Sequence, residues 1–251
     1  MATPYKTVLI TGASSGLGRG LAAWFAKRGD VTVFAAARRT AQLDSLRREV
    51  GDAIVPLALD VSQADATHER IVALDAECGG LELVIANAGV APLTYGRAID
   101  WKVVKNVVDV NVTGALATLC AALPGMVARG RGHLVGVSSM ASFLAAPRMS
   151  TYCASKTFLM TWLASLRLDV APLGLHVTSL HPGFVKTEMT ANNRPGTLPF
   201  LMEADVAVER MAKAILRRAE AYAFPWQMRA AMTGGNLLPR STLIKIFDER
   251  F

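Results

Sequence analysis

Three side chains in the middle of the chain have the types and spacing needed to move a proton onto or off a substrate oxygen. Tyr152 and Lys156 are four residues apart, so a helix beginning near Thr151 places both on one face, one turn apart. A tyrosine hydroxyl has an ordinary pKa of about 10, and a nearby ammonium favours the phenolate. Bringing that pKa to about 7 takes about 4 kcal/mol, which a partly buried site can supply. Ser139 follows the apolar run 134–137, so its hydroxyl would stand at a strand end, where it can hold a substrate oxygen.

Tyrosine and lysine at helical spacing are also common on helix surfaces, so the interpretation depends on the elements that would position them. Near the start of the chain, the β-branched run 7–10 ends at T-G-A-S-S-G-L-G, residues 11–18, and a helical pattern follows to about Gly29. A strand, a glycine-rich turn and a helix start can hold a pyrophosphate, because the backbone approaches closely and the helix N-terminus offers free N–H groups. The spacing G-x-x-x-G-x-G differs from the usual G-x-G-x-x-G fingerprint. We predict a dinucleotide site here; a chance glycine-rich turn is the alternative.

The end of the second predicted strand, 31–37, indicates which dinucleotide is bound. An NAD site is expected to place a carboxylate here for the ribose 2′-hydroxyl. This chain has Ala37 followed by Arg38 and Arg39, and guanidinium groups bind a 2′-phosphate through charge-assisted hydrogen bonds. We therefore predict NADP(H) in preference to NAD(H), with Arg38 as the main contact and Arg39 and Ser14 as helpers. Two solvated loop arginines are the alternative.

Together, the glycine-rich turn and the later Ser139, Tyr152 and Lys156 resemble the short-chain dehydrogenase/reductase family, with matching motifs from Thr11 to Thr187. Independently of the resemblance, strands that alternate with helical patterns predict an α/β fold. It would be a Rossmann-like, doubly wound and mostly parallel sheet with helices on both faces, in three αβα layers.

The resemblance implies roles for residues around the adenine end of the cofactor and along the helix predicted over 100–126. Asp60 and Val61 would lie beside the adenine ring, although Asp60 could instead cap a helix that starts near Ser62. Asn87-Ala88-Gly89 is similar to the family signature Asn-Asn-Ala-Gly, with Ala86 in place of the first asparagine. Asn111 would sit at a helix distortion that lets a water reach the active-site lysine; an asparagine tolerated on a helix flank is the alternative.

The resemblance also implies the nicotinamide end of the site. Pro182 and Gly183 would turn the chain under the nicotinamide, the backbone amide near Val185 would bind its carboxamide, and Thr187 would add a hydroxyl. His181 is not expected to pair with Ser139, because no G-x-S-x-G elbow is present. The predicted catalytic residues are Asn111, Ser139, Tyr152 and Lys156. The predicted cofactor-binding residues are Gly12, Ser14, Ser15, Gly16, Leu17, Gly18, Arg38, Arg39, Asp60, Val61, Asn87, Ala88, Gly89, Tyr152, Lys156, Pro182, Gly183, Val185 and Thr187.

The last part of the chain carries weaker signals. Residues 188–204 mix turn formers with apolar residues and are expected to form a substrate lid. Apolar residues on nearby loops weakly favour an apolar substrate, or belong to the core instead; they are Val90, Leu93, Met140, Phe143, Leu144 and Met149. Segment 225–251 is expected to carry a docked helix with Leu243, Phe247 and Phe251 on one face. Contact of that helix with a membrane surface is the less favoured alternative.

Composition narrows the classes of protein. The chain has 251 residues, enough for one dinucleotide-binding catalytic domain over 1–251, and a net charge of +7 that would attract anionic nucleotides. Its basic residues are scattered, which argues against nucleic-acid binding. Three cysteines without a C-x-x-C pair and no visible signal peptide indicate a cytoplasmic protein with reduced thiols. The apolar stretch 110–128 contains polar residues and a proline and is read as a buried helix. No His/Cys cluster suggests a metal.

These observations predict an NADP(H)-dependent oxidoreductase that acts on a ketone or aldehyde and the corresponding alcohol, as a reductase. A hydride would pass from the nicotinamide to the carbonyl carbon while Tyr152 donates a proton to the oxygen. Ser139 would orient that oxygen, and Lys156 would lower the pKa of Tyr152 and hold the nicotinamide ribose. The resemblance also implies a homo-oligomer, a dimer or a tetramer. The alternatives are an NAD-dependent alcohol dehydrogenase of the same family and a non-catalytic NADP(H)-binding sensor or scaffold.

Overall fold

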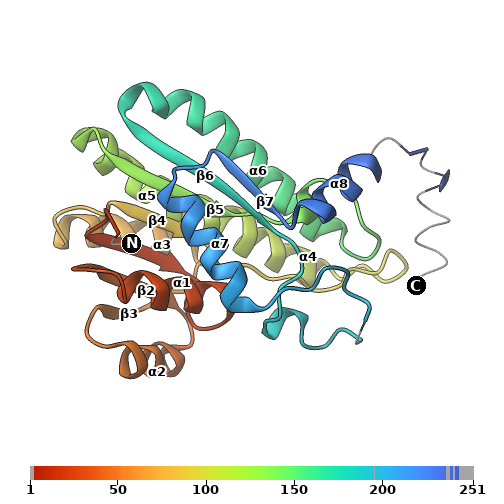
Figure 1. The fold of residues 1–251 in the computed structure, drawn as a ribbon, viewed down its shortest axis with the longest axis horizontal. Helices are drawn as coiled ribbons and strands as arrows, with labels where there is room; N and C mark the ends of the chain where they lie inside the picture. Colours follow the sequence, from red (N-terminus) through yellow and green to blue (C-terminus); the bar gives the residue numbers. More distant parts are fainter. Residues whose placement is uncertain (1–2, 195, 236–237, 240, 243–251) are drawn as a thin grey trace.

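A seven-stranded parallel sheet forms the centre of the molecule (Figure 1). The computed structural model describes residues 3–194, 196–235, 238–239 and 241–242. The strand order is β3-β2-β1-β4-β5-β6-β7, and each neighbouring pair is parallel. Because the order reverses between β1 and β4, the crevice between their carboxyl ends is the expected ligand site of such a fold. The strands are β1 Thr7–Thr11, β2 Thr32–Ala37, β3 Ile54–Ala58, β4 Leu83–Ala86, β5 Gly132–Val137, β6 Leu175–Pro182 and β7 Ala221–Phe224.

Helices cover both faces of the sheet. Strand β1 shows why: Val8 and Ile10 point into one apolar core and Leu9 into the other, and all three are fully buried. Strands that are buried on both faces are typical of parallel sheets. This arrangement confirms the predicted doubly wound αβα fold. The first core is covered by α1 Gly16–Ala26, α2 Thr40–Val50 and α7 Ala204–Leu216, and the second by α3 Ala64–Glu77, α5 Gly114–Arg129 and α6 Ser150–Val170.

The helix predicted over 100–126 is longer and is interrupted. It comprises α4 Trp101–Val108, a π-helical turn at Asp109–Thr113 and then α5. Within the described residues, Trp101–Arg129 is the one helix long and apolar enough to cross a membrane by length and composition, and 56% of its most apolar window is buried in the fold. Helix α5 packs against α3, β4 and β5, which agrees with the prediction of a buried helix.

The segment after β6 passes over the carboxyl edge of the sheet. Met202 forms a parallel bridge with Val185, so both ends of the predicted lid 188–204 are anchored. Of its apolar residues, Met202 packs against the core, whereas Phe200 and Leu201 are exposed. Helix α8, Trp226–Gly235, follows β7. The predicted apolar face of Leu243, Phe247 and Phe251 lies outside the described residues.

Candidate active site

A cavity of 760 Å³ lies at the carboxyl ends of β1, β2, β4, β5 and β6. Of the predicted catalytic and cofactor-binding residues, only Asn111 does not line it. Residues that are far apart in the chain are therefore brought into one space, as the parallel topology requires. The cavity also contains residues that the sequence did not single out, among them Ala91, Pro92, Glu188, Met189 and Thr190.

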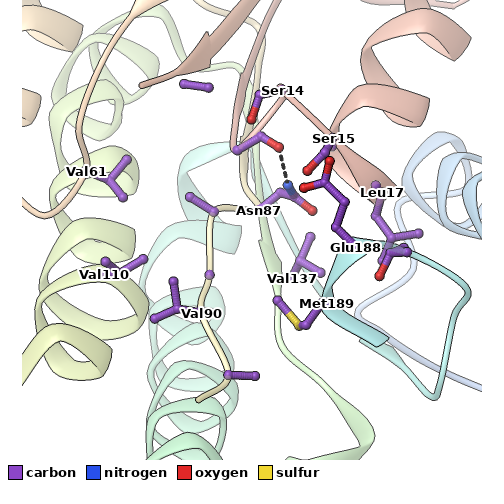
Figure 2. Close-up of a pocket in the computed structure, with 18 of the residues that line it drawn as sticks. Ser14, Ser15, Leu17, Val61, Asn87, Val90, Val110, Val137, Glu188 and Met189 are labelled. Carbon is purple, nitrogen blue, oxygen red and sulfur yellow. Dashed lines mark hydrogen bonds between the residues drawn. The ribbon is translucent and has the colours of Figure 1, made fainter. Parts of the chain in front are cut away.

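The glycine-rich turn is closely packed against β4. Gly12 and Gly16 have φ angles of +70° and +54°, a region that favours glycine. A Cβ atom on Gly18 would lie 2.3 Å from the Gly12 carbonyl oxygen and 2.4 Å from Asn87 Nδ2. Asn87 Nδ2 in turn donates to the Thr11 carbonyl at 2.9 Å, and Asn87 lies beside the turn (Figure 2).

The start of α1 is open to a ligand. Ser15, at its N-cap, makes no side-chain cap bond, so the first N–H groups of the helix remain available to an anion. The glycines lack side chains, so a ligand can come close to the backbone of the turn. Arg38 and Arg39, which line the same cavity, add positive charge. These features fit the pyrophosphate of a dinucleotide.

The two arginines after β2 have different surroundings. Arg39 donates to Ser15 Oγ at 2.7 Å and to Ser14 Oγ at 3.1 Å, and it pairs with Glu188 at 3.0 Å. Hydrogen bonds from Arg39 and Ser15 hold the pKa of Glu188 below its usual value. Arg38 is more exposed and lies 3.9 Å from Asp60. In the structure, Arg39 therefore contacts the glycine-rich turn, whereas Arg38, predicted as the main contact of a 2′-phosphate, is the more exposed of the two.

Asp60 has a local structural role, but not the predicted alternative one. Its carboxylate accepts hydrogen bonds from the Ser62 backbone N–H at 3.1 Å and hydroxyl at 2.8 Å. Helix α3 begins at Ala64, with Gln63 at the N-cap, so the suggestion that Asp60 caps this helix is wrong. Asp60 and Val61 line the cavity, where the family resemblance places them.

Three of the four predicted catalytic side chains, those of Ser139, Tyr152 and Lys156, meet at the end of β5. Ser139 follows that strand, and Tyr152 and Lys156 lie on the first turns of α6. Lys156 Nζ is buried, donates to the Val137 carbonyl at 2.8 Å and lies 5.8 Å from the centre of the Tyr152 ring. The Ser138 hydroxyl donates to the Lys156 carbonyl at 2.8 Å. These bonds fasten α6 to β5 and fix the position of Lys156 beside the tyrosine.

The pKa of Tyr152 is shifted in the direction opposite to the prediction. Burial raises the pKa of its hydroxyl, and a hydrogen bond with Ser139 lowers it in part. Burial also lowers the pKa of Lys156 to about 8. Removal from water disfavours both the phenolate and the ammonium, and burial is the largest influence on the pKa of each group. Tyr152 is therefore a neutral hydroxyl near pH 7, able to donate a proton.

Asn111 lies behind the cavity, not in its wall. It is fully buried within the π-helical turn, which is the helix distortion that the resemblance implied. Its side-chain oxygen accepts from the Val90 N–H at 2.8 Å, and its Nδ2 donates to the Val90 carbonyl at 2.9 Å and to Ser155 Oγ at 3.1 Å. A Cβ atom on Gly89 would lie 3.4 Å from both Asn111 Oδ1 and Lys156 Nζ. Asn111 thus fixes the loop after β4 next to the lysine.

His181 is a buried residue of β6 and does not serve Ser139 as a base. Its ring nitrogens contact Ser142 Oγ at 3.1 Å and Ser179 Oγ at 2.9 Å, and burial lowers its pKa to about 4. Of the six apolar loop residues proposed for the substrate pocket, only Val90 lines the cavity. Within the described chain, no group of three or more His, Cys, Asp or Glu side chains could hold a metal ion.

Comparison with known proteins agrees with this architecture. The family described as short chain dehydrogenase matches residues 6–197. A protein of Myxococcus xanthus (strain DK1622) named "Uncharacterized oxidoreductase" is 54% identical over 239 residues, which cover 94% of this chain and 93% of that protein.

Solved structures show the same fold. The short-chain dehydrogenase from Sphingobium yanoikuyae in complex with NADPH has a TM-score of 0.80 and 29% identity, covering 96% of this chain and 95% of that one. The 3-ketoacyl-(acyl-carrier-protein) reductase from Brucella melitensis complexed with NADH has a TM-score of 0.79 and 25% identity, covering 87% and 96%. The chain therefore belongs to the short-chain dehydrogenase family and is an NAD(P)-dependent oxidoreductase.

Proposed function

We propose that the protein is an NADP(H)-dependent reductase of ketones or aldehydes, with Tyr152 as the proton donor. The observation that carries this proposal is the position of Tyr152, Lys156 and Ser139 in the same cavity as the glycine-rich turn. A protein that only binds the dinucleotide has no need for a tyrosine hydroxyl placed between a serine and a buried lysine. This feature favours the enzyme over a sensor or scaffold.

Each residue has a defined task in the proposed reaction. When bound, the nicotinamide supplies the hydride that the carbonyl carbon receives. Ser139 would hold the substrate oxygen, and Tyr152 would donate its proton to that oxygen as negative charge develops there. Lys156 would hold the nicotinamide ribose and stabilise the phenolate that remains. Asn111 would keep the loop after β4 in place beside Lys156.

The preference for NADP(H) is supported by the two arginines at the end of β2. Arg39 is already paired with Glu188 at 3.0 Å, whereas Arg38 lies at a longer 3.9 Å from Asp60 and is more exposed. Arg38 can therefore turn towards a 2′-phosphate at a small cost. The related solved structures contain NADPH in one case and NADH in another, so the preference depends on this chain's own residues.

Arg38→Ala is expected to weaken NADPH binding about tenfold or more and to leave NADH binding nearly unchanged, because only NADPH carries the phosphate. Dissociation constants measured by fluorescence titration provide the check. Arg47→Ala is the matched control, since this exposed arginine of α2 pairs with Asp52 and does not line the cavity. An equal loss of affinity for NADPH and NADH would contradict the assignment of Arg38.

The raised pKa of Tyr152 supports reduction as the working direction, because reduction needs the protonated hydroxyl and oxidation needs the phenolate. Lys156, with a pKa lowered to about 8, loses its charge first as the pH rises. The kcat/KM for carbonyl reduction is therefore expected to be level from about pH 6 to 7 and to fall about tenfold per unit above about pH 8. A pH profile of NADPH oxidation tests this. A rate that stays constant up to about pH 10 would contradict it.

The function itself is tested by following NADPH and NADH oxidation with a panel of ketones and aldehydes of different size and polarity. Turnover with NADPH, faster than with NADH, is the expected result. NADPH binding without turnover across the panel would favour the sensor, and faster turnover with NADH would favour the NAD-dependent alcohol dehydrogenase.

The wider setting is part of the same proposal. The protein would be a single catalytic domain, a cytoplasmic homo-oligomer that binds a small carbonyl or alcohol substrate and no nucleic acid. Several basic side chains are engaged by carboxylates across the surface, such as Arg19 with Glu49 and Arg70 with Glu77. This dispersion does not favour a nucleic-acid surface. Light scattering tests whether the protein is an oligomer. Retention on DNA at several salt concentrations tests whether it binds nucleic acid.

A further inference from the structure

A second cavity lies at the opposite, amino-terminal edge of the sheet. Its volume is 370 Å³, within the range of pockets that hold small ligands. It lies where β1, β4, β5 and β6 begin and where the chain enters β7. None of its residues belongs to the predicted cofactor-binding or catalytic set. The side chains with polar chemistry that line it are Tyr5, Glu82, Arg131, His133, His176 and Arg218.

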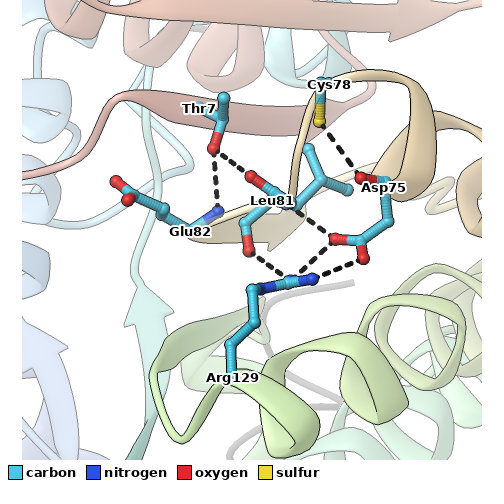
Figure 3. Close-up of polar contacts among 7 residues, drawn as sticks. Thr7, Asp75, Cys78, Leu81, Glu82 and Arg129 are labelled. Carbon is cyan, nitrogen blue, oxygen red and sulfur yellow. Dashed lines mark hydrogen bonds and ion pairs between the residues drawn. The ribbon is translucent and has the colours of Figure 1, made fainter.

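The neighbouring polar groups on this edge satisfy one another. The Asp75 carboxylate accepts two hydrogen bonds from Arg129 at 2.8 Å and one from the Leu81 N–H at 2.6 Å (Figure 3). The Thr7 hydroxyl accepts from the Glu82 N–H at 3.1 Å. This network fastens α3 and α5 to the start of β4 and fixes the backbone of Glu82. Asp75 and Arg129 are therefore paired with each other, whereas Glu82, whose carboxylate accepts from the Lys6 N–H at 2.7 Å, lines the cavity.

At the floor of the cavity, the side chains of Tyr5, His133 and Thr178 hydrogen-bond one another in series. The Thr178 hydroxyl donates to the Ala219 carbonyl at 2.6 Å, so its oxygen must accept from His133 Nε2 at 2.8 Å. His133 Nδ1 is then the acceptor for the Tyr5 hydroxyl at 2.7 Å. Burial lowers the pKa of His133 to about 3, which agrees with a neutral ring. The donors of the floor are therefore occupied.

The walls, in contrast, carry positive charge that is only partly compensated, and the Arg218 side chain hydrogen-bonds the Tyr5 side chain. In the part of the chain that the structure describes, no carboxylate lies within ion-pair distance of Arg218, and the ring nitrogens of His176 make no hydrogen bond. Arg131 reaches Glu82 only at 3.7 Å. The positive charge of Arg218 acts on the cavity, because it adds to burial in lowering the pKa of both His133 and His176.

Arg218 also has an unfavourable backbone conformation. Its φ is +54°, and it lies just after the end of α7. Two backbone hydrogen bonds close this helix end: the Arg218 N–H donates to the Ile215 carbonyl at 2.9 Å, and the Ala219 N–H donates to the Ala214 carbonyl at 3.0 Å. Glycine is the residue favoured at such a helix end. An arginine is strained in this conformation relative to glycine. A strained residue of this kind points to a use for its side chain.

We propose that this cavity binds a small organic anion through a carboxylate or phosphate group, with Arg218 as the main contact and His176 and Arg131 beside it. A guanidinium pairs with either group through two parallel hydrogen bonds. The closed, neutral floor would receive the uncharged part of the ligand. The site is independent of the proposed reductase activity and lies at the amino-terminal edge of the sheet, opposite the cavity of that activity.

The test is calorimetric titration of the full-length protein, saturated with NADP⁺ to fill the cofactor site, with phenyl phosphate, benzoate and the neutral benzyl alcohol. We expect at least one anion to bind and the alcohol not to bind. Arg218→Gly should weaken anion binding about tenfold or more. The same variant should melt at an equal or higher temperature, because glycine relieves the backbone strain. A purely structural arginine would instead lower the melting temperature.

The control is Arg217→Ala, which removes the same charge one residue earlier from a side chain that does not line the cavity. Its anion affinity should stay within about twofold of the wild-type value. A preference for phenyl phosphate or for benzoate assigns the binding group. The proposal is overturned if neither anion binds up to about 10 mM, or if Arg218→Gly binds them as tightly as the wild type.

Discussion

Gly18→Ala is expected to lower kcat/KM with NADPH about 100-fold, since displacement of a binding loop by about 1 Å has effects of this size. The added methyl group would lie 2.3 Å from the Gly12 carbonyl oxygen and 2.4 Å from Asn87 Nδ2. Neither atom can yield easily, because the first belongs to the backbone of the turn and the second holds Thr11. The overlap should also reduce the free energy of unfolding by about 1–3 kcal/mol.

Two control variants separate the effect on the cofactor site from the effect on stability. Gly20→Ala, in the same helix, would meet a methyl group of Val208 on α7 at 2.5 Å and should lose stability with little change in NADPH affinity. Gly96→Ala has no atom within 4 Å and should change neither. If Gly18→Ala bound NADPH as tightly as Gly20→Ala, the turn would not be the pyrophosphate site.

The sequence could predict the features that depend on local patterns. Apolar runs such as 7–10 and 134–137 become strands because they are buried on both faces, and the turn after β1 needs glycines wherever φ is positive. Parallel strands bring their carboxyl ends to one edge, so residues that follow different strands meet there. This is why Asn87, Ser139 and Pro182 line one cavity, although they are far apart in the chain.

The features that the sequence did not predict depend on contacts between distant segments. Nothing near Thr187 indicated that Glu188 would pair with Arg39, because the pair forms only when the segment after β6 crosses towards β2. The shift in the pKa of Tyr152 was predicted with the wrong sign, since the spacing to Lys156 gives the charge but not the burial. Asp60 was given an alternative capping role, but the helix starts later, at Ala64. The series of hydrogen bonds from Tyr5 through His133 to Thr178 depends on the order of the strands, and no local sequence pattern indicates it.

Tyr152→Phe is expected to lower kcat for carbonyl reduction by about 10²–10⁴-fold, the usual contribution of a positioned acid. The substitution removes one oxygen atom and keeps the ring. Lys156 stays bonded to the Val137 carbonyl at 2.8 Å, so the helix face and the cavity should keep their shape. NADPH affinity is therefore expected to change less than about tenfold. Tyr222→Phe is the control, since this half-buried tyrosine of β7 stacks on Phe224 and lies outside the cavity.

The most direct test of the account is a single-turnover measurement of carbonyl reduction, with NADPH bound in advance to the wild type, Tyr152→Phe and Tyr222→Phe. Because the cofactor is already in place, the rate reports the chemical step. The account predicts a rate about 10²–10⁴ times lower for Tyr152→Phe than for the wild type and an unchanged rate for Tyr222→Phe. If Tyr152→Phe reduced the carbonyl at the wild-type rate, the Tyr152 hydroxyl would not be the proton donor.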